Sequence, residues 1–245
     1  MSGISLIVDS EPELELLLRQ ARLSESFRGK ASELTIEGSS VMPAKTIRAV
    51  LLALPNISSL ILTTPCSAPD IVFLGVQLSK LTLLKTNLPH AVLVDFIRRT
   101  PTIRFLTLGC CGNDPPCGLR ILDFRRIEQL IAPLECINGI LYTTTVLSLL
   151  QQLIWLRSLK LTTSARMVSH GGSLSDERAL ITRWLTGRRK ATSGTKFHPA
   201  LLEIGILYAL KRNPRSGWLS GWRRDGEDWI RIRHLGPDLT CGADI

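Results

Sequence analysis

Three segments of the chain repeat one arrangement of hydrophobic and polar positions. Each reads proline, any residue, aliphatic, two of any, aliphatic, any residue, aliphatic, and they span residues 55–62, 101–108 and 199–206. With 13 prolines in the chain, composition alone would give about 0.5 such matches. Because the last two aliphatic residues are separated by one position, each copy predicts a short strand that buries one face.

The aliphatic part of the pattern also occurs without the proline. These copies lie at residues 31–36, 78–83, 119–124 and 156–161. If the copy at 119–124 is left out, the central aliphatic residues, starting from Leu34, follow one another at intervals of 26, 21, 25, 53 and 45 residues. The first three intervals match a unit of ~20–29 residues with one strand each, and the last two have the length of double units.

Helical periodicity fills segments between the strand copies. In Ala44–Leu54 the apolar residues recur at offsets of three and four, and a proline closes the segment. Pro89–Arg99 begins with a proline and ends with two arginines, a pattern typical of helices. Glu11–Ala21 and Asp176–Thr186 have similar apolar spacing. The alternation of strands with helices predicts an α/β fold.

Stacked units of this kind predict a curved solenoid, because one unit cannot bury its own apolar face. In each strand the two closing aliphatic residues point inward, and the residue between them faces the concave side. We therefore expect non-catalytic protein recognition on the concave strand face. The candidate contact residues in this register are Thr35, Glu37, Ile61, Thr82, Thr107, Lys160 and Thr162.

The stretch LTLLKTNLPHAVLVDFIRRTPTIRFLTLGCC at residues 81–111 contains a strand, a short helix that begins at Leu-Pro, and the proline pattern. This order resembles the irregular leucine-rich repeats of fungal F-box-type proteins. The segment LDFRRIEQLIAPL at residues 122–134 is similar to the one that follows in that group. The resemblance covers about residues 31–206. It implies a leucine-rich-repeat solenoid that recognises substrates, or serves as a scaffold, in a ubiquitin-ligase context.

The resemblance also predicts how the chain is divided. Residues 1–30 form an N-terminal strand–helix cap, residues 31–206 the solenoid, and residues 207–245 an atypical C-terminal cap or tail. An F-box normally precedes such repeats, and the first 30 residues contain none. The segment LPHAVLVDFI at residues 88–97 imitates an F-box, but it lies between two strand copies, so we interpret it as a repeat helix. Binding of a ubiquitin-ligase adaptor stays an open alternative.

The charge distribution adds a second kind of partner. The net charge is +9, of which +3 falls in residues 1–164 and +6 in residues 165–245. A basic excess attracts nucleic acid or acidic proteins. Tryptophans among the arginines near the C-terminus are suited either to stack on nucleotides or to cover the last repeat. The candidate basic residues are Arg188, Arg189, Lys190, Arg223, Arg224, Arg231 and Arg233.

The sequence contains no phosphate-binding loop, His-Glu-x-x-His, Cys-x-x-Cys or nucleophile elbow. We therefore expect neither an enzyme nor a bound cofactor or metal. The rival class is a hydrolase whose catalytic residues meet only in the folded chain. The six cysteines make a poor disulfide framework. Without a secretory signal or an apolar span, we expect a cytoplasmic or nuclear protein that does not engage a membrane.

Overall fold

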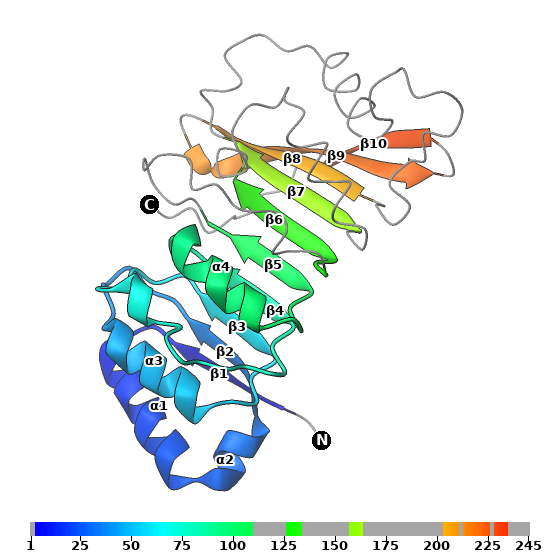
Figure 1. Ribbon diagram of the computed structural model, residues 1–245. Helices are drawn as coiled ribbons and strands as arrows, with labels where there is room; N and C mark the ends of the chain where they lie inside the picture. Colours follow the sequence, from blue (N-terminus) through cyan, green and yellow to red (C-terminus); the bar gives the residue numbers. More distant parts are fainter. Residues whose placement is uncertain are drawn as a thin grey trace. The chain divides into compact units, whose positions relative to one another are not determined.

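The structure is a computed structural model, and it describes residues 3–109, 126–133, 157–163, 203–210, 213–225 and 228–234. The chain divides into two compact units, Met1–Asn113 and Asp114–Ile245. Parallel strands occur in both units, and helices join the strands of the first (Figure 1). The predicted α/β class is therefore confirmed.

The strands of the first unit stand side by side in chain order, and all of them run parallel. They are β1 (Ile4–Val8), β2 (Ala31–Ile36), β3 (Ser59–Leu62), β4 (Leu83–Thr86) and β5 (Phe105–Leu108). The helices of the connections are α1 (Glu11–Leu23), α2 (Glu25–Lys30), α3 (Ala44–Ala53), the 3₁₀ helix η1 (Pro69–Ile71) and α4 (His90–Arg99). Figure 1 shows α1, α3 and α4 over one face of this sheet, so the opposite face has no helix from the described part of the unit.

Three of the predicted helices are confirmed within two residues at each end. Helix α1 has glutamates in its first turn and Arg22 in its last turn, which suits the helix dipole. Helices α3 and α4 each begin directly after a proline, Pro43 and Pro89, whose fixed φ favours helix initiation. The predicted helix at Asp176–Thr186 lies outside the described residues.

Leucines at matching strand positions form the centre of the core. Strand pairing sets Leu34, Leu60, Leu84 and Leu106 beside one another, and each is at most 1 % exposed. We call these four residues the leucine row. Burying a leucine side chain contributes about 1.5–3 kcal/mol, so the row stabilises every strand pair from β2 to β5. The registers predicted for β2, β3 and β5 are confirmed.

Strand β4 lies three residues further along the chain than the sequence predicts. Leu84, and not Leu81, pairs with Leu60 of β3, and Thr86 occupies the place of the last aliphatic residue. The Thr86 hydroxyl is buried and accepts a hydrogen bond from the Leu88 N–H at 3.1 Å. The expected register was wrong because the segment LTLL offers aliphatic residues in both registers, and threonine conceals the true one.

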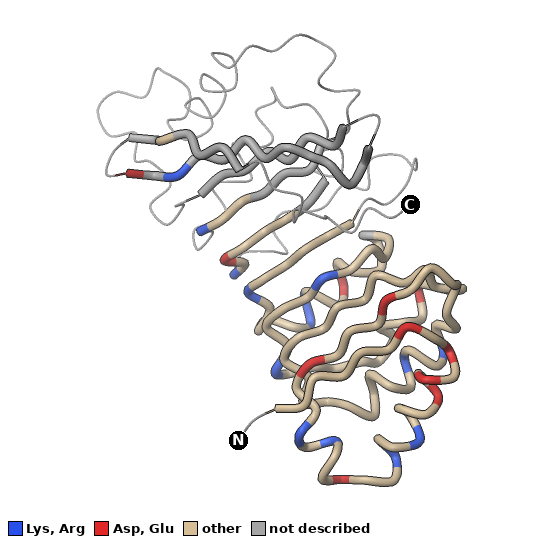
Figure 2. Tube along the Cα trace, turned by 180° about the vertical axis from the view of Figure 1, so that it is seen from behind, with Lys and Arg blue, Asp and Glu red and all other residues tan. Residues whose placement is uncertain are grey.

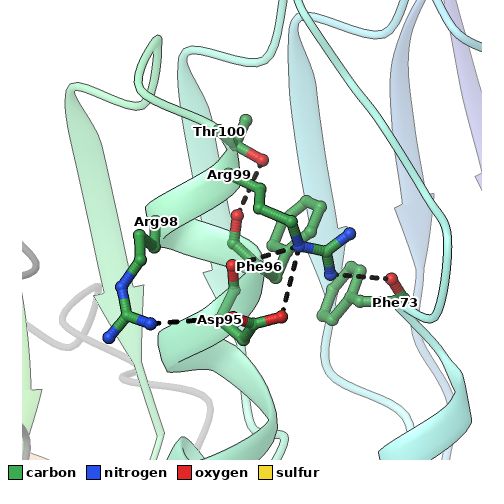
Figure 3. Close-up of polar contacts among 6 residues, drawn as sticks. All are labelled: Phe73, Asp95, Phe96, Arg98, Arg99 and Thr100. Atoms are coloured by element: carbon green, nitrogen blue, oxygen red, sulfur yellow. Dashed lines mark hydrogen bonds and ion pairs between the residues drawn. The ribbon is translucent and has the colours of Figure 1, made fainter.

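The connection between β3 and β4 is fastened to both neighbouring helices. Arg48 of α3 donates from Nε to the Leu74 carbonyl at 2.6 Å, and Arg99 of α4 donates from Nη2 to the Phe73 carbonyl at 3.4 Å. The Phe73 ring stacks on Phe96 of α4 with 4.0 Å between ring centroids (Figure 3). Contacts from α3 and α4 therefore hold this connection, which contains the short η1 helix, in place.

The second unit changes from parallel to antiparallel pairing along the chain. Its described strands are β6 (Gln129–Pro133), β7 (Ser158–Thr163), β8 (Glu203–Leu210), β9 (Asn213–Asp225) and β10 (Asp228–His234). Strands β6, β7 and β8 pair in parallel, and β9 then pairs antiparallel with both β8 and β10. The strands predicted around Leu159 and Ile204 are confirmed.

Strand β6 is an element that the sequence analysis missed. Its pattern is Ile127, Leu130 and Ala132, so a small residue stands where every other described copy except β4 has a large aliphatic one. Ile127 and Leu130 are each 2 % exposed. Leu130 divides the long interval between Leu106 and Leu159 into steps of 24 and 29 residues. The interval therefore is a double unit, as its length predicts, with a strand at its middle.

Replacement of Phe96 by alanine should destabilise the protein strongly. The ring is fully buried and stacked, so its loss leaves a cavity that costs about 3–5 kcal/mol. Phe105→Ala is the matched control, since Phe105 is 40 % exposed, and it should cost less than about 1 kcal/mol. Urea denaturation of both variants measures the difference. Equal losses would contradict the assigned core.

Candidate interaction surface

We call the helix-free face of the first sheet the open face. Its residues alternate with the buried ones along each strand, and all of them are exposed or half-buried. Strand pairing arranges them in two rows that cross the sheet. The first row is Ser5, Glu33, Ser59, Leu83 and Phe105, and the second is Ile7, Thr35, Ile61, Lys85 and Thr107.

Three of the predicted contact residues fall in the second row. Thr35, Ile61 and Thr107 are all half-buried, and Lys85 stands between the last two. Glu37 follows β2 directly, is exposed, and donates its backbone N–H to Val8 at 3.0 Å. The structure thus brings these residues together on one face, and their role in binding stays a prediction.

Thr82 was expected on the open face and is not part of it. Because β4 lies three residues further along the chain than predicted, Lys85 occupies the place that Thr82 was predicted to take. The Thr82 hydroxyl instead donates to the Ser58 carbonyl at 3.1 Å. The error follows directly from the shifted register of β4.

A ladder of hydroxyl groups joins the strands where they begin. The bond from Thr82 to the Ser58 carbonyl recurs twice. The Ser58 hydroxyl donates to the Ser32 carbonyl at 3.0 Å, and the Ser32 hydroxyl donates to the Ile4 carbonyl at 3.4 Å. Each hydroxyl satisfies a carbonyl of the preceding strand. The sequence signal for this ladder is a serine or threonine directly after the first aliphatic residue of three successive copies.

The open face combines apolar and polar side chains with few charges. Ile7 is 68 % and Phe105 40 % exposed, although both are large apolar residues. The charged residues in the two rows of the open face are Glu33 of β2 and Lys85 of β4. Figure 2 shows how sparsely charged residues occur along the strands of the first unit. An exposed surface of this mixed composition is typical of protein contact regions.

The remaining predicted contacts, Lys160 and Thr162, lie on β7 in the second unit. Lys160 pairs with Ile131 of β6, and Thr162 pairs with Pro133 of the same strand. Both therefore occupy a parallel strand of the same kind as those of the first unit, at alternate positions. They remain predicted contacts of that strand.

The hairpin of β9 and β10 contains four of the predicted basic residues. In its register Arg223 pairs with Ile230, Arg224 with Trp229, Arg231 with Trp222, and Arg233 with Ser220. Arg223 is exposed, and on its other side it pairs with Glu203 of β8. Two of the four arginines, Arg224 and Arg231, thus pair with tryptophans in the strand register, and nucleic-acid binding by this hairpin stays a prediction. Arg188, Arg189 and Lys190 lie outside the described residues.

Cys66 is a half-buried cysteine of the first unit. Burial raises the pKa of its thiol to about 11, because the thiolate would lose hydration. Its Sγ lies 3.6 Å from the Thr64 carbonyl, which accepts the thiol hydrogen. A thiol that stays protonated at neutral pH is a poor nucleophile. Among the described residues, no three His, Cys, Asp or Glu side chains gather as metal ligands.

Comparison with known proteins adds no relative. A scan against protein-family models and a search of curated proteins both find nothing that matches this chain. In the described ranges, no helix combines the length and apolar character needed to cross a bilayer. The functional conclusion therefore depends on the geometry of the open face.

Replacement of Thr86 by valine should cost about 1–3 kcal/mol of folding free energy. The change keeps the volume but leaves the buried Leu88 N–H without its acceptor. Thr107→Val on the open face is the control and should change stability by less than about 0.5 kcal/mol. Chemical denaturation compares the two, and a harmless Thr86→Val would contradict the register assigned to β4.

Cys66 should react slowly with thiol reagents. A pKa of about 11, against the ordinary 9.0, lowers the thiolate fraction at pH 8 about 100-fold relative to a free thiol. The labelling rate of the Cys66 peptide, followed by mass spectrometry, should therefore keep rising with pH up to about 11. A rate that levels off near pH 9 would contradict the assigned burial.

Proposed function

We propose that this protein is a leucine-rich-repeat solenoid whose open face recognises a protein partner without catalysis. The observation that carries the proposal is the strand order of the first unit, in which parallel strands follow one another in chain order. Each connection returns over the same face, so every added unit extends one continuous helix-free surface. Repeat proteins use surfaces of this kind for binding.

The same strand order argues against a small-molecule site in this unit. Open α/β sheets bind ligands where the strand order reverses, because the connections there diverge and leave a crevice. Within residues 3–109, the described part of the first unit, the strand order has no reversal. The polar and apolar side chains of the open face instead extend in two rows across all five strands, which suits a protein better than a metabolite.

The proposal includes substrate recognition in a ubiquitin ligase, as the sequence resemblance implies. In that role the 88–97 segment does not bind the adaptor through its apolar side chains. Leu93 and Phe96 of α4 are fully buried, and Ile97 is 4 % exposed. Any adaptor must therefore bind through residues other than these three.

Capture of partners by the tagged full chain should depend on the open face. The double variant Ile61→Arg/Thr107→Arg should lose at least about ten-fold of a salt-resistant partner, because two new charges interrupt the second row. Leu52→Arg on α3, where the side chain is 47 % exposed, is the matched control and should retain the partner. Quantitative mass spectrometry of lysate captures, with circular dichroism of each variant, measures this.

The outcomes separate the alternatives. Equal capture by the open-face variant and wild type would contradict the proposal. Proteins that carry nucleic acid and are lost between about 50 and 200 mM salt would assign binding to the basic residues of the β9–β10 hairpin. Recovery of a ubiquitin-ligase adaptor and cullin that the open-face variant retains, while it loses a further protein, would place substrate recognition in that pathway.

A further inference from the structure

Strand β1 forms one end of the first sheet, and within the described residues it pairs with β2 alone. The carbonyls of Ile4 and Val8 point toward β2, where they accept hydrogen bonds from the Ser32 hydroxyl and the Glu37 N–H. In a parallel strand, alternate residues direct their backbone groups to opposite sides. The backbone N–H and C=O groups of Ser5 and Ile7 therefore face the open edge.

Apart from the irregular register between Ile4 and Ser5, this edge lacks the charges and prolines that usually prevent strands from joining. Ile4–Val8 contains no charged residue, proline or glycine, although proteins commonly place such residues on exposed edges. The Ile7 side chain beside the edge is 68 % exposed. At the end after Val8, the Asp9 N–H is not available for pairing, because it donates to the Glu13 carboxylate at 3.2 Å. The stretch that can pair is thus short and centred on Leu6.

Helix α1, which follows β1, has its charges divided along its length. Its acidic residues, Glu11, Glu13 and Glu15, lie in the first half, and its basic residues, Arg19 and Arg22, lie in the second half. Two copies of this helix placed antiparallel would set each acidic half against a basic half. The helix is therefore complementary in charge to its own reversed copy.

Apolar side chains lie on the solvent side of the same helix. Leu16 is 55 % and Leu23 88 % exposed, and they are seven residues apart, so they share one side of the helix. The opposite side is buried through Leu14, Leu17 and Ala21. An antiparallel copy offers cover for apolar surface that the fold itself leaves in water.

We propose that β1 and α1 form a surface for a second copy of this chain. A two-fold axis normal to the sheet and passing near Leu6 makes β1 antiparallel to its copy and, by the same operation, makes α1 antiparallel to its copy. Ser5 of each copy then exchanges both backbone hydrogen bonds with Ile7 of the other. The sheet continues across the axis, and the divided charges of the helices meet in opposite pairs.

A second copy satisfies these features better than an extended peptide does. A peptide added to β1 would take up the free backbone groups, but it would leave the charge division of α1 and the exposed leucines unused. The symmetry that pairs the strands also pairs the helices, which makes the surface complementary to itself. This association uses Ser5 and Ile7 at one end of the open face and leaves Thr35, Ile61 and Thr107 uncovered, so it neither requires nor excludes the proposed partner binding.

Sedimentation velocity of the full chain should show a monomer–dimer equilibrium that depends on concentration. Ile7→Lys should weaken dimerisation at least about ten-fold, because pairing brings the two new charges close together. Leu74→Lys is the control, since Leu74 is 60 % exposed and lies in the β3–β4 connection, and it should leave the dimer unchanged. A monomeric wild type at roughly 100 μM, or equal effects of the two variants, would overturn the proposal.

Exchanging charges on α1 tests the antiparallel arrangement of the two helices without changing any residue of β1. One variant, Arg19→Glu/Arg22→Glu, makes α1 acidic throughout, and another, Glu11→Arg/Glu15→Arg, makes it largely basic; Glu13 is kept because it binds the Asp9 N–H. Each should be monomeric alone, and an equimolar mixture should form a heterodimer. A mixture that stays monomeric while both variants retain their helical circular dichroism would overturn the antiparallel arrangement.

Amide exchange locates the contact on the strand. In the dimer, the Ser5 and Ile7 amides should become protected from hydrogen–deuterium exchange as the concentration rises, and Ile7→Lys should remove this protection. A dimer that leaves both amides equally fast at all concentrations would contradict pairing through β1.

Discussion

The leucine row is the constraint on which the rest of the first unit depends. A strand can join this sheet only in the register that sets its central leucine beside the one before it, because a shift by one residue would turn the apolar side chains to the wrong face. Leu60 and Leu84 are both fully buried in this way. Because the buried leucines need cover on one face, the helices lie over that face, and the other face carries no helix among the described residues.

The repeat that contains β4 matches the sequence pattern only weakly, yet it takes its place in the sheet. It has threonine in place of an aliphatic residue, and the connection before it contains the short η1 helix. Both deficits are offset locally. The Thr86 hydroxyl accepts a hydrogen bond from the Leu88 N–H, and Arg48 and Arg99 donate hydrogen bonds to carbonyl groups of the connection.

The sequence predicted the α/β class, three helices and most strand registers, because these depend on local periodicity and on proline. It failed where an aliphatic position is filled by another residue, as at Thr86 of β4 and Ala132 of β6. Of the open face, Thr35, Ile61 and Thr107 could be chosen from the repeat, whereas Lys85 could not, because it depends on the register of β4. The hydroxyl ladder has a signal in the sequence, a serine or threonine at one position of three copies, but its hydrogen bonds join residues distant in sequence and were not predicted.

Native-state hydrogen exchange of the β2–β5 amides tests the central claim most directly. If the leucine row couples these strands, then the amides of β3, β4 and β5 must exchange through one common opening with similar free energy, and a small addition of denaturant should lower all of them together. The account predicts that β4, despite its weak sequence pattern, is protected as well as its neighbours. Exchange of β4 at the rate of a surface loop, with β3 and β5 still protected, would contradict it.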